Sequence, residues 1–515
     1  SRRDATTGLE LVVQGDRIPN FGRDQLYTYL GFSIDLGGEA AKQQVTQLVE
    51  EFRTTLDKLT IAPLPVNAKL DAVNIMASSK LNFYYCNIHF TEKVLKELED
   101  LIVSFVREQL KLNNSSTRAH VFTPRRRGGL GIIKPSTVYH AKRTSFLLSV
   151  LNSDDDRVRA AARHSFALHM TKRKVPTAGP HDDNFGGYAV NEDRRLQKAS
   201  RVYWSRSTFV ELNELCIRLR LQLVYDEASD LYALLVPASD DDEVHVRFTD
   251  PQQLYSAVKR LEMERDLDYW RELQRQGGFQ RQTVPSTDMT VSLSHLTNKK
   301  LNDNMTRFIC KGRLQLLETN SVIHTYFPDN PSSCPLCGFH TDSNSHALNG
   351  CRELKGLYTD RHDRVVGLVG DVLEKNIVTD YCDVLCDQRV QFDGFTSVGI
   401  ANNRPDITII DHANSVAFIV EVAVPYDSFI DTCYQHKFDK YMPLCLALNN
   451  VGFHTKIIVL IIGSLGHVHK RFVSGLQTLG ISRQASRSLA RYVATSVMIG
   501  SRRVWERRRF RVGVV

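Results

Sequence analysis

The chain has 515 residues, and its 66 Lys and Arg residues against 58 Asp and Glu residues give a formal net charge of +8. That length is enough for about three domains of ordinary size. A hydrophobic content of 42% and a charged content of 24% are close to globular averages, and they exclude a wholly disordered chain and a coiled-coil rod. The longest apolar run, between Lys456 and Gly463, has the length of a strand and is well short of the ~18 residues of a membrane span, so no membrane partner is expected.

The first residues, from Ser1 to Ala5, are polar and have no signal-peptide pattern, and no initiator Met precedes them. We therefore expect the chain to be a fragment of a longer protein. Its 10 cysteines are too few and too unevenly placed for a disulfide scaffold, which favours a reducing compartment.

In chain order, the predicted elements begin with short extended pieces over residues 1–38. Apolar side chains at three- and four-residue spacing then predict helices near residues 39–60, 66–88, 91–112, 136–152 and 155–170. A polar stretch over 171–200 is the predicted linker, and a mixed region that runs to residue 285 contains a predicted strand at 231–236. A helical stretch near 297–318 precedes a group of cysteines. After residue 356 the order helix, strand, strand, helix, strand predicts a compact α/β unit.

Arginine is concentrated in two places. Arg125, Arg126 and Arg127 precede a Gly pair, whose backbone can approach a phosphate closely. The segment from Arg483 to Arg511 is rich in arginine and has a single acid, Glu506. Localised arginine on an otherwise balanced chain is typical of polyanion binding. The alternative for the C-terminal cluster is a solvated basic tail or a localisation signal.

Four side chains have the spacing of a zinc knuckle: Cys334, Cys337, His346 and Cys351. The short turn of Cys-x2-Cys directs two thiolates at one point, and a His and a Cys that follow complete a tetrahedron. Because all four positions are filled by protein ligands, the pattern predicts a closed structural Zn²⁺ site. The alternative is a chance grouping of reduced cysteines.

Two carboxylates flank a predicted β-hairpin. If its loop is residues 412–415, Asp411 faces Val416 and Asp406 faces Glu421, with about 5 Å between the Cβ atoms of each pair. Two carboxylates that close repel each other unless a cation lies between them, and Mg²⁺ is the natural candidate. A register slip of one residue would place them on opposite faces of the sheet.

Two lysines lie on the predicted helix that follows, near residues 428–449. Lys437 interrupts an apolar stripe at three- and four-residue spacing and is expected to point toward the sheet, and Lys440 lies about one turn later on a neighbouring face. A lysine near two carboxylates can orient a water nucleophile or stabilise charge that develops on a phosphate. The alternative for each lysine is an ordinary surface ion pair.

Asp406, Glu421 and a following lysine resemble the active-site order of the PD-(D/E)xK nuclease superfamily, which includes many restriction enzymes. The usual Glu-x-Lys of that superfamily would need a lysine at position 423, where this chain has Ala423. The resemblance therefore implies that the lysine has moved to the helix, as it has in some members.

A wider resemblance connects this cluster to mobile elements. The order of the knuckle, Arg361-His362-Asp363 and the Asp–Glu pair resembles the C-terminal half of non-LTR (type-1) retrotransposon Pol proteins of the R-two type, which combine a reverse transcriptase with a restriction-like endonuclease. That family usually has Asn where this chain has Asp363. Residues 29–32 (Tyr-Leu-Gly-Phe) resemble a signature that follows the palm, and residues 127–131 resemble a motif beyond the thumb.

The resemblance implies a multidomain α and α/β fold with a helical thumb and linker, a small CCHC zinc knuckle and a PD-(D/E)xK-like α/β endonuclease domain. The implied regions are the end of a reverse transcriptase palm (1–38), the thumb with a helical extension (39–170), a linker region (171–296), a helical segment with the knuckle (297–356), and the endonuclease domain with a basic C-terminal tail (357–515). The chain has no Tyr/Phe-x-Asp-Asp motif, so the polymerase active site is expected upstream of Ser1.

The implied activity is a Mg²⁺-dependent nick in double-stranded target DNA, ribosomal DNA for the R-two type. The 3′-hydroxyl at the nick then primes reverse transcription of the element RNA. The implied location is the nucleus, the nucleolus included. By this resemblance Asp406 and Glu421 hold Mg²⁺ while Lys437 and Lys440 assist at the scissile phosphate. The expected nucleic-acid contacts are Arg125, Arg126, Arg127, Arg361, His362, Arg507, Arg508 and Arg509.

Two other functions remain open. A domesticated or degenerate descendant would bind nucleic acid through the knuckle and the arginines without cleaving it. An unrelated restriction enzyme or resolvase would explain the carboxylates but neither the thumb-like helices nor the knuckle. Metal-dependent nicking of supercoiled DNA would distinguish the endonuclease from the binding module.

Overall fold

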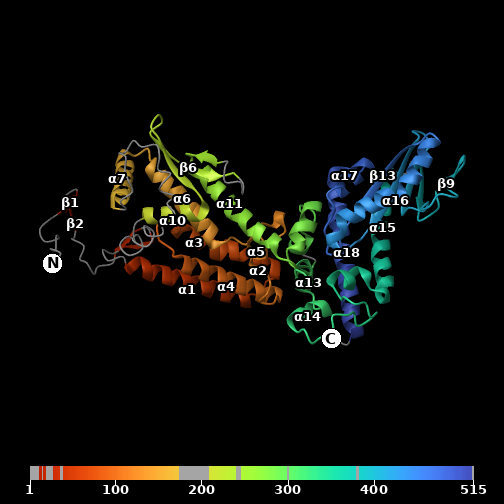
Figure 1. The fold of residues 1–515 in the computed structure, drawn as a ribbon, viewed down its shortest axis with the longest axis horizontal. Helices are drawn as coiled ribbons and strands as arrows, with labels where there is room; N and C mark the ends of the chain where they lie inside the picture. Colours follow the sequence, from red (N-terminus) through yellow and green to blue (C-terminus); the bar gives the residue numbers. More distant parts are fainter. Residues whose placement is uncertain are drawn as a thin grey trace. The chain divides into compact units, whose positions relative to one another are not determined.

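The computed structural model describes residues 11–13, 16–18, 27–29, 31–34, 39–172, 208–238, 245–298, 301–377 and 382–512 (Figure 1). These residues form two compact units. Unit 1 comprises residues 1–62, 72–102 and 133–263, and unit 2 comprises residues 63–71, 103–132 and 264–515. Residues 173–200 of the predicted linker and most of the predicted palm segment lie outside the described residues. Among the described helices, none is long and apolar enough to cross a membrane.

The two units are defined by contacts within the chain, and the domain boundaries implied by the resemblance stay a prediction. Residues 264–296, which the resemblance assigns to a linker region, belong to the same unit as the predicted endonuclease domain. The physical reason is hydrophobic and backbone contact: Val291 is buried in the core of that domain, and Asp288 N–H donates to Val468 O at 2.9 Å. The predicted thumb region, in turn, contributes residues to both units.

Unit 1 contains the helices that the apolar spacing predicted. They are α1 (Glu39–Ile61), η1 (Val73–Ser78), α3 (Ser79–Tyr84), α4 (Glu92–Leu110, which continues into unit 2), α6 (Pro135–Leu151) and α7 (Asp156–Lys172). Unit 1 also contains α10 (Thr208–Leu219) and α11 (Pro251–Glu272, which also continues into unit 2), which lie in the region predicted only as mixed. Short antiparallel pairs near its start are β1 (Leu11–Val13) with β2 (Asp16–Ile18), and β3 (Tyr27–Tyr29) with β4 (Phe32–Ile34). The predicted helix at 66–88 is divided into α2 (Val66–Ala72, in unit 2), the π-helical η1 and α3.

Unit 1 also holds a three-stranded sheet of which the sequence indicated only one strand. Its order is β5 (Gln222–Asp226), β6 (Leu231–Pro237) and β7 (His245–Phe248), with both pairs antiparallel. The central strand packs Tyr232, Leu234 and Val236 into a buried core shared with α6, α10 and α11. Burial on one face stabilises a sheet of this size, which would be marginal alone.

Unit 2 is organised around a four-stranded sheet in the order β13-β12-β11-β8. The strands are β8 (Cys382–Cys386), β11 (Ile407–Asp411), β12 (Val416–Ala423) and β13 (His454–Ile461). β11 pairs antiparallel with both β8 and β12, whereas β12 and β13 run parallel. A parallel pair needs a crossover connection, and the chain between β12 and β13 contains α16 (Ile430–Asn450).

Helices cover both faces of this sheet. Alternate residues of a strand point to opposite faces, so Ala417 and Ile419 pack with Tyr441 and Leu444 of α16, while Val420 and Val422 lie in the other core. That second core is formed with α15 (Lys355–Ile377), α17 (Phe472–Thr478) and α18 (Arg483–Val512). In Figure 1 these helices and β13 are labelled in the blue and green part of the chain.

The remaining elements of unit 2 are short. They are α5 (Arg118–Phe122), η2 (Arg125–Arg127), η3 (Phe279–Thr283), η4 (Val284–Ser286), α12 (Ser294–Thr297), α13 (Asp303–Arg313), α14 (Asn320–Tyr326), η5 (His346–Gly350), η6 (Arg352–Leu354), β9 (Gln391–Phe392), β10 (Phe395–Thr396) and η7 (Asp427–Phe429).

The predicted hairpin register is confirmed. Asp411 pairs with Val416 and Ile407 pairs with Val420, so the next position along the ladder sets Asp406 opposite Glu421. The C-terminal segment differs from the prediction of a basic tail. It is the helix α18, which buries Val493, Ala494 and Val497 against the sheet layer because apolar residues recur on one face between the arginines.

Candidate functional site

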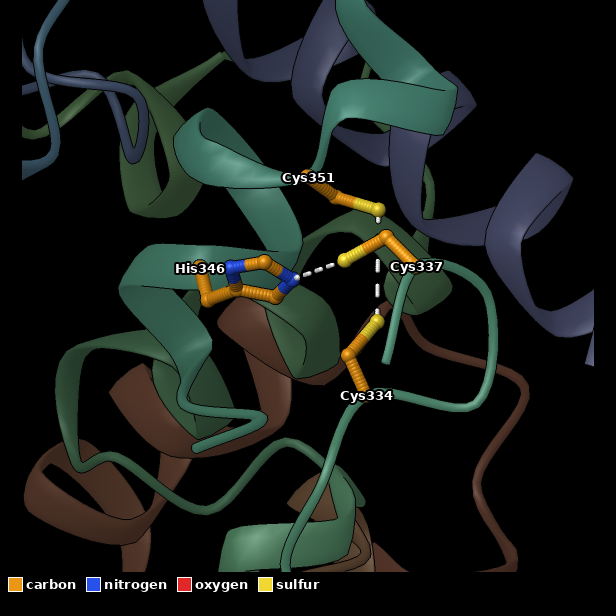
Figure 2. A group of neighbouring side chains, drawn as sticks. All are labelled: Cys334, Cys337, His346 and Cys351. Atoms are coloured by element: carbon orange, nitrogen blue, oxygen red, sulfur yellow. Dashed lines mark hydrogen bonds between the residues drawn. The ribbon is translucent and has the colours of Figure 1, made fainter. Parts of the chain in front are cut away.

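Four metal-ligating side chains meet in unit 2. Cys334 and Cys337 come from a turn, His346 from the start of η5, and Cys351 from the residue that follows η5. Their ligand atoms all lie within 4.8 Å of one another. Cys334 Sγ is 3.9 Å from Cys351 Sγ, and Cys337 Sγ is 3.3 Å from His346 Nε2 (Figure 2).

The donor set and its spacing fit a tetrahedral zinc ion. Zn–S bonds of about 2.3 Å and Zn–N bonds of about 2.0 Å imply edges of about 3.8 Å between two sulfurs and about 3.5 Å between sulfur and nitrogen. Burial raises the pKa of the Cys334 thiol, and it raises the pKa of the Cys351 thiol to about 12. The thiolates that zinc binding requires therefore need a cation beside them. This Cys3His cluster could bind zinc, as its spacing predicted.

The knuckle is held by a buried ion pair from α18. Arg508 forms an ion pair with Asp342, and both side chains are almost fully buried. Asp342 Oδ2 also accepts the Asn320 N–H at 2.8 Å, at the start of α14. Arg508 was expected to contact nucleic acid, but its guanidinium is enclosed by the protein and its position links the knuckle to the C-terminal helix.

The two carboxylates of the hairpin lie side by side. The Asp406 N–H donates to Glu421 Oε2 at 3.3 Å, and the Val422 N–H donates to Asp406 Oδ2 at 2.7 Å. Glu421 lies two residues beyond Ile419, so it shares the face of the sheet that α16 covers. The Glu421 side chain is 2% exposed, whereas that of Asp406 is 19% exposed and open to a ligand.

Both predicted lysines reach Glu421 from α16. Lys437 Nζ lies 2.5 Å from Glu421 Oε1, and Lys440 Nζ lies 3.5 Å from the same oxygen. Lys440 also donates to the Tyr441 hydroxyl at 2.8 Å, and that hydroxyl donates to Arg404 O at 3.2 Å. The lysines remain about one quarter exposed. Lys437 is therefore the direct partner of the buried carboxylate, and Lys440 is divided between two acceptors.

His362, which was expected to contact nucleic acid, belongs to the same cluster. Its Nε2 lies 3.4 Å from Asp406 Oδ2 and 3.2 Å from Val422 O, and its Nδ1 lies 3.0 Å from Asp363 Oδ1. The hydrogen bond to Asp406 raises the pKa of His362 to about 9. The Arg-His-Asp motif thus places an imidazole against the carboxylate at the end of the hairpin.

Arg361 has a different environment. It is buried, its Nη1 donates to Ser501 Oγ at 2.7 Å, and burial lowers its pKa to about 10. A Cβ at Gly500 would lie 2.9 Å from Arg361 Cγ, so a glycine of α18 makes room for the side chain. Arg361 therefore joins α15 to α18 rather than presenting its charge to solvent.

The arginines before the Gly pair are divided in the same way. Arg125 donates to Leu130 O at 3.1 Å and forms an ion pair with Asp71, while Arg127 lies 3.2 Å from Glu264. Arg126 is exposed. Gly128 has a φ of +90°, and a Cβ there would lie 2.7 Å from the Phe279 ring. Gly128 therefore allows the backbone to pack tightly against Phe279 within the protein.

The C-terminal arginines also differ from one another in their exposure. Arg507 is exposed, with its guanidinium carbon 5.6 Å from the Phe510 ring centroid, and Arg509 is half-buried. Arg511 donates to Glu353 O at 2.8 Å, next to the knuckle. Of the three C-terminal arginines expected to contact nucleic acid, Arg507 is exposed, Arg509 is half-buried and Arg508 is buried.

Tyr441 is a residue of the site that sequence reasoning missed. Tyr441 lies in the apolar stripe of the helix and is buried, but no signal in the sequence indicates that its hydroxyl bonds Lys440. Burial, with the nearby Glu421 carboxylate as a second cause, raises the pKa of this phenol far above its usual range, so it stays protonated and can donate.

Comparison with known proteins gives one relevant similarity. No protein-family model matches the chain. Over 121 residues the chain is 34% identical to the retrovirus-related Pol polyprotein from the type-1 retrotransposable element R2 of Popillia japonica. The match covers 24% of this chain and 24% of that polyprotein. This similarity supports a non-LTR retrotransposon protein.

Proposed function

We propose that this chain is part of a non-LTR retrotransposon Pol protein and that unit 2 carries a Mg²⁺-dependent DNA endonuclease. The observation that carries the proposal is the convergence of Asp406, Glu421, Lys437 and Lys440 at one end of a mixed four-stranded sheet. A hairpin followed by a helical crossover to a parallel strand agrees with the PD-(D/E)xK architecture that the motif order implies.

The carboxylates fit a hard divalent cation. Mg²⁺ in phosphoryl-transfer sites uses one or two protein carboxylates and completes its octahedron with waters and substrate oxygens. Asp406 Oδ2 is occupied by the Val422 N–H, and among the described residues its Oδ1 has no hydrogen-bond partner. When bound by Asp406 and Glu421, Mg²⁺ would supply charge neutralisation at the scissile phosphate.

The lysines would act on the same phosphate. Lys437, held by Glu421, would orient the attacking water and stabilise negative charge that develops on the phosphoryl oxygens. In the proposed hydrolysis the water oxygen forms a new bond to phosphorus, the bond from phosphorus to O3′ breaks, and O3′ takes up a proton. The 3′-hydroxyl that results is the group that would prime reverse transcription of the element RNA by the parent polymerase.

The test is nicking of supercoiled plasmid by the purified chain with Mg²⁺. We expect conversion to the open-circular form by the parental chain, none with EDTA, and none by the Asp406→Ala variant in Mg²⁺. Lys456→Ala is the matched control, because Lys456 is exposed on β13 and is not part of the carboxylate cluster. Its rate should equal the parental rate.

The main alternative is a domesticated or degenerate module that binds nucleic acid without cleaving it. Metal-independent DNA binding by a parental chain that never nicks, over a range of Mg²⁺ and Mn²⁺ concentrations, would favour this alternative and contradict the endonuclease.

A further inference from the structure

An aromatic and basic cluster lies one helical turn from the proposed nuclease site. It consists of Tyr434 on α16 and of His469, Lys470 and Arg471 in the segment between β13 and α17. The His469 ring stacks on Tyr434 with 4.7 Å between the centroids and 15° between the planes. The Arg471 guanidinium carbon lies 4.8 Å from the Tyr434 centroid, within cation–π range. We call these four residues the Tyr434 platform.

Neighbouring hydrogen bonds hold the platform in place. The Arg471 N–H donates to His469 Nδ1 at 3.2 Å, so the ring proton belongs on Nε2, which lies 3.2 Å from the Asp431 carboxylate. The Lys470 N–H donates to Ser286 O at 3.0 Å, and Thr287 forms an isolated β-bridge with His469. A backbone segment held in this way loses little further freedom when its side chains bind a ligand.

The charge of the platform suits a polyanion. Lys470 and Arg471 are exposed, and neither forms an ion pair with a carboxylate in the part of the chain that the structure describes. The acidic residue next to the platform is Asp431, whose Oδ1 lies 3.2 Å from His469 Nε2. The folding of unit 2 therefore leaves two cations beside an aromatic ring at the protein surface, a combination typical of nucleic-acid contacts.

The position of the platform relates it to the proposed cleavage. Tyr434 and Lys437 are three residues apart on α16, so they lie on one face of the helix, about 4.5 Å apart along its axis. Phosphates of one DNA strand repeat about every 3.4 Å along the duplex axis. A strand that runs along α16 with its scissile phosphate at Lys437 would bring a phosphate one or two nucleotides away to the platform.

We propose that the Tyr434 platform binds the cleaved DNA strand at a phosphate one or two nucleotides from the nick, with Arg471 as the principal contact, and that this contact positions the scissile phosphate. The inference rests on the proposed function because it takes the bound strand to be the strand that is cut. Arg471 is a positioning residue: it acts on the neighbouring phosphate and not on the reacting atoms.

The first test measures the salt dependence of DNA affinity with the full chain. Each lost phosphate contact should reduce the slope of log affinity against log salt by about 0.9. We expect that reduction for Arg471→Ala, and none for Arg157→Ala, which removes an exposed arginine of α7 in unit 1. An Arg471→Ala slope equal to the parental slope would overturn the inference, whether or not the chain nicks DNA.

The second test locates the contact with duplexes that carry one neutral methylphosphonate at successive positions around the nick. A methylphosphonate at one position, one or two nucleotides from the nick, should slow nicking by the parental chain about tenfold or more. The same modification should not slow Arg471→Ala further, because the two changes remove the same interaction. Arg471→Lys should recover part of the sensitivity. Additive effects at every position would overturn the inference while leaving the proposed endonuclease intact.

Zinc content and the thermal midpoint are measured for each variant to show that it is folded. If Arg471→Ala shows the expected loss of salt slope but the parental chain does not nick DNA, the proposed endonuclease is wrong and the DNA contact of Arg471 stands.

Discussion

Lys437 donates a hydrogen bond to Glu421, with 2.5 Å between Nζ and Oε1, across the interface between α16 and β12. The pair joins a residue near the middle of a helix to a carboxylate that is 2% exposed in the neighbouring strand. The usual nuclease pattern has its lysine at position 423, which is Ala423 here. Ala423 ends β12 and is buried against Ile430 of α16. The lysine that contacts Glu421 therefore comes from α16 and not from β12.

This arrangement predicts unequal roles for the two lysines. Lys437→Ala should lower the rate of DNA nicking by about 100-fold or more, because it removes the cation in direct contact with Glu421. Lys440→Ala should cause a smaller loss, since Lys440 lies farther from Glu421 and also bonds Tyr441. Single-turnover nicking rates check this, with DNA affinity and zinc content expected to stay near parental values. If Lys437→Ala nicks DNA at the parental rate while Lys440→Ala is inactive, the roles assigned to the two lysines are reversed.

The second prediction concerns the metal of the knuckle. Purified chain should contain about one zinc ion, and Cys351→Ser should lose it, because three remaining ligands leave an open tetrahedron and buried thiols without a cation. Elemental analysis and protease sensitivity near residues 334–351 are the measurements. Cys386→Ser is the matched control, since Cys386 is exposed on β8 outside the cluster, and it should retain its zinc. A parental zinc content near zero would contradict the site.

The third prediction separates structural from binding arginines in α18. Arg508→Ala should destabilise unit 2 by about 3–5 kcal/mol, because it leaves Asp342 buried without its partner. Arg507→Ala should leave stability unchanged, and it should reduce the salt slope of nucleic-acid binding by about 0.9 if Arg507 contacts a phosphate. Denaturant unfolding and binding at several salt concentrations distinguish the two effects. Equal stability losses in both variants would argue against the assigned roles.

The fourth prediction is a pH dependence of stability in unit 1. His140 is fully buried, with Nδ1 2.6 Å from Glu262 and Nε2 2.8 Å from Glu92. Burial alone would lower the pKa of His140, but the hydrogen bonds to Glu262 and Glu92 outweigh it and raise the pKa to about 9. A pKa raised in the folded state stabilises the fold fully below the unfolded value of 6.5, and this contribution is lost as the pH rises through about 9.

The contribution amounts to about 3 kcal/mol at low pH, by the usual conversion of a pKa shift to free energy. Thermal midpoints of the parental chain should therefore decline between pH 6.5 and pH 9. His140→Gln should have a lower midpoint and a smaller decline, because the contribution of His362, whose pKa is also raised to about 9, remains. His164→Gln, at an exposed position of α7, should retain the parental pH profile. A parental midpoint that does not change over this range would contradict a charged His140.

Part of the candidate site could be predicted because its signals are local. The four-residue loop and the alternation of the hairpin set Asp406 against Glu421, and the helical period of α16 directed Lys437 toward the sheet. The four predicted zinc ligands all lie between residues 334 and 351, so their spacing in the sequence alone brings them together. In the hairpin and in the helix the geometry of regular backbone sets which side chains share a face, and in the knuckle the short sequence separation brings the ligands together.

Tertiary structure alone decided which cations are buried and what they contact. Arg361 and Arg508 have neighbours of the same residue type that are exposed, and no feature of their composition distinguishes them. Their burial follows from contacts with Ser501 and Asp342, each more than 100 residues away in the chain. The contact of His362 with Asp406 and the stack of His469 on Tyr434 likewise join separate elements. Local periodicity determines the face on which a side chain lies, whereas packing between distant segments determines what meets it there.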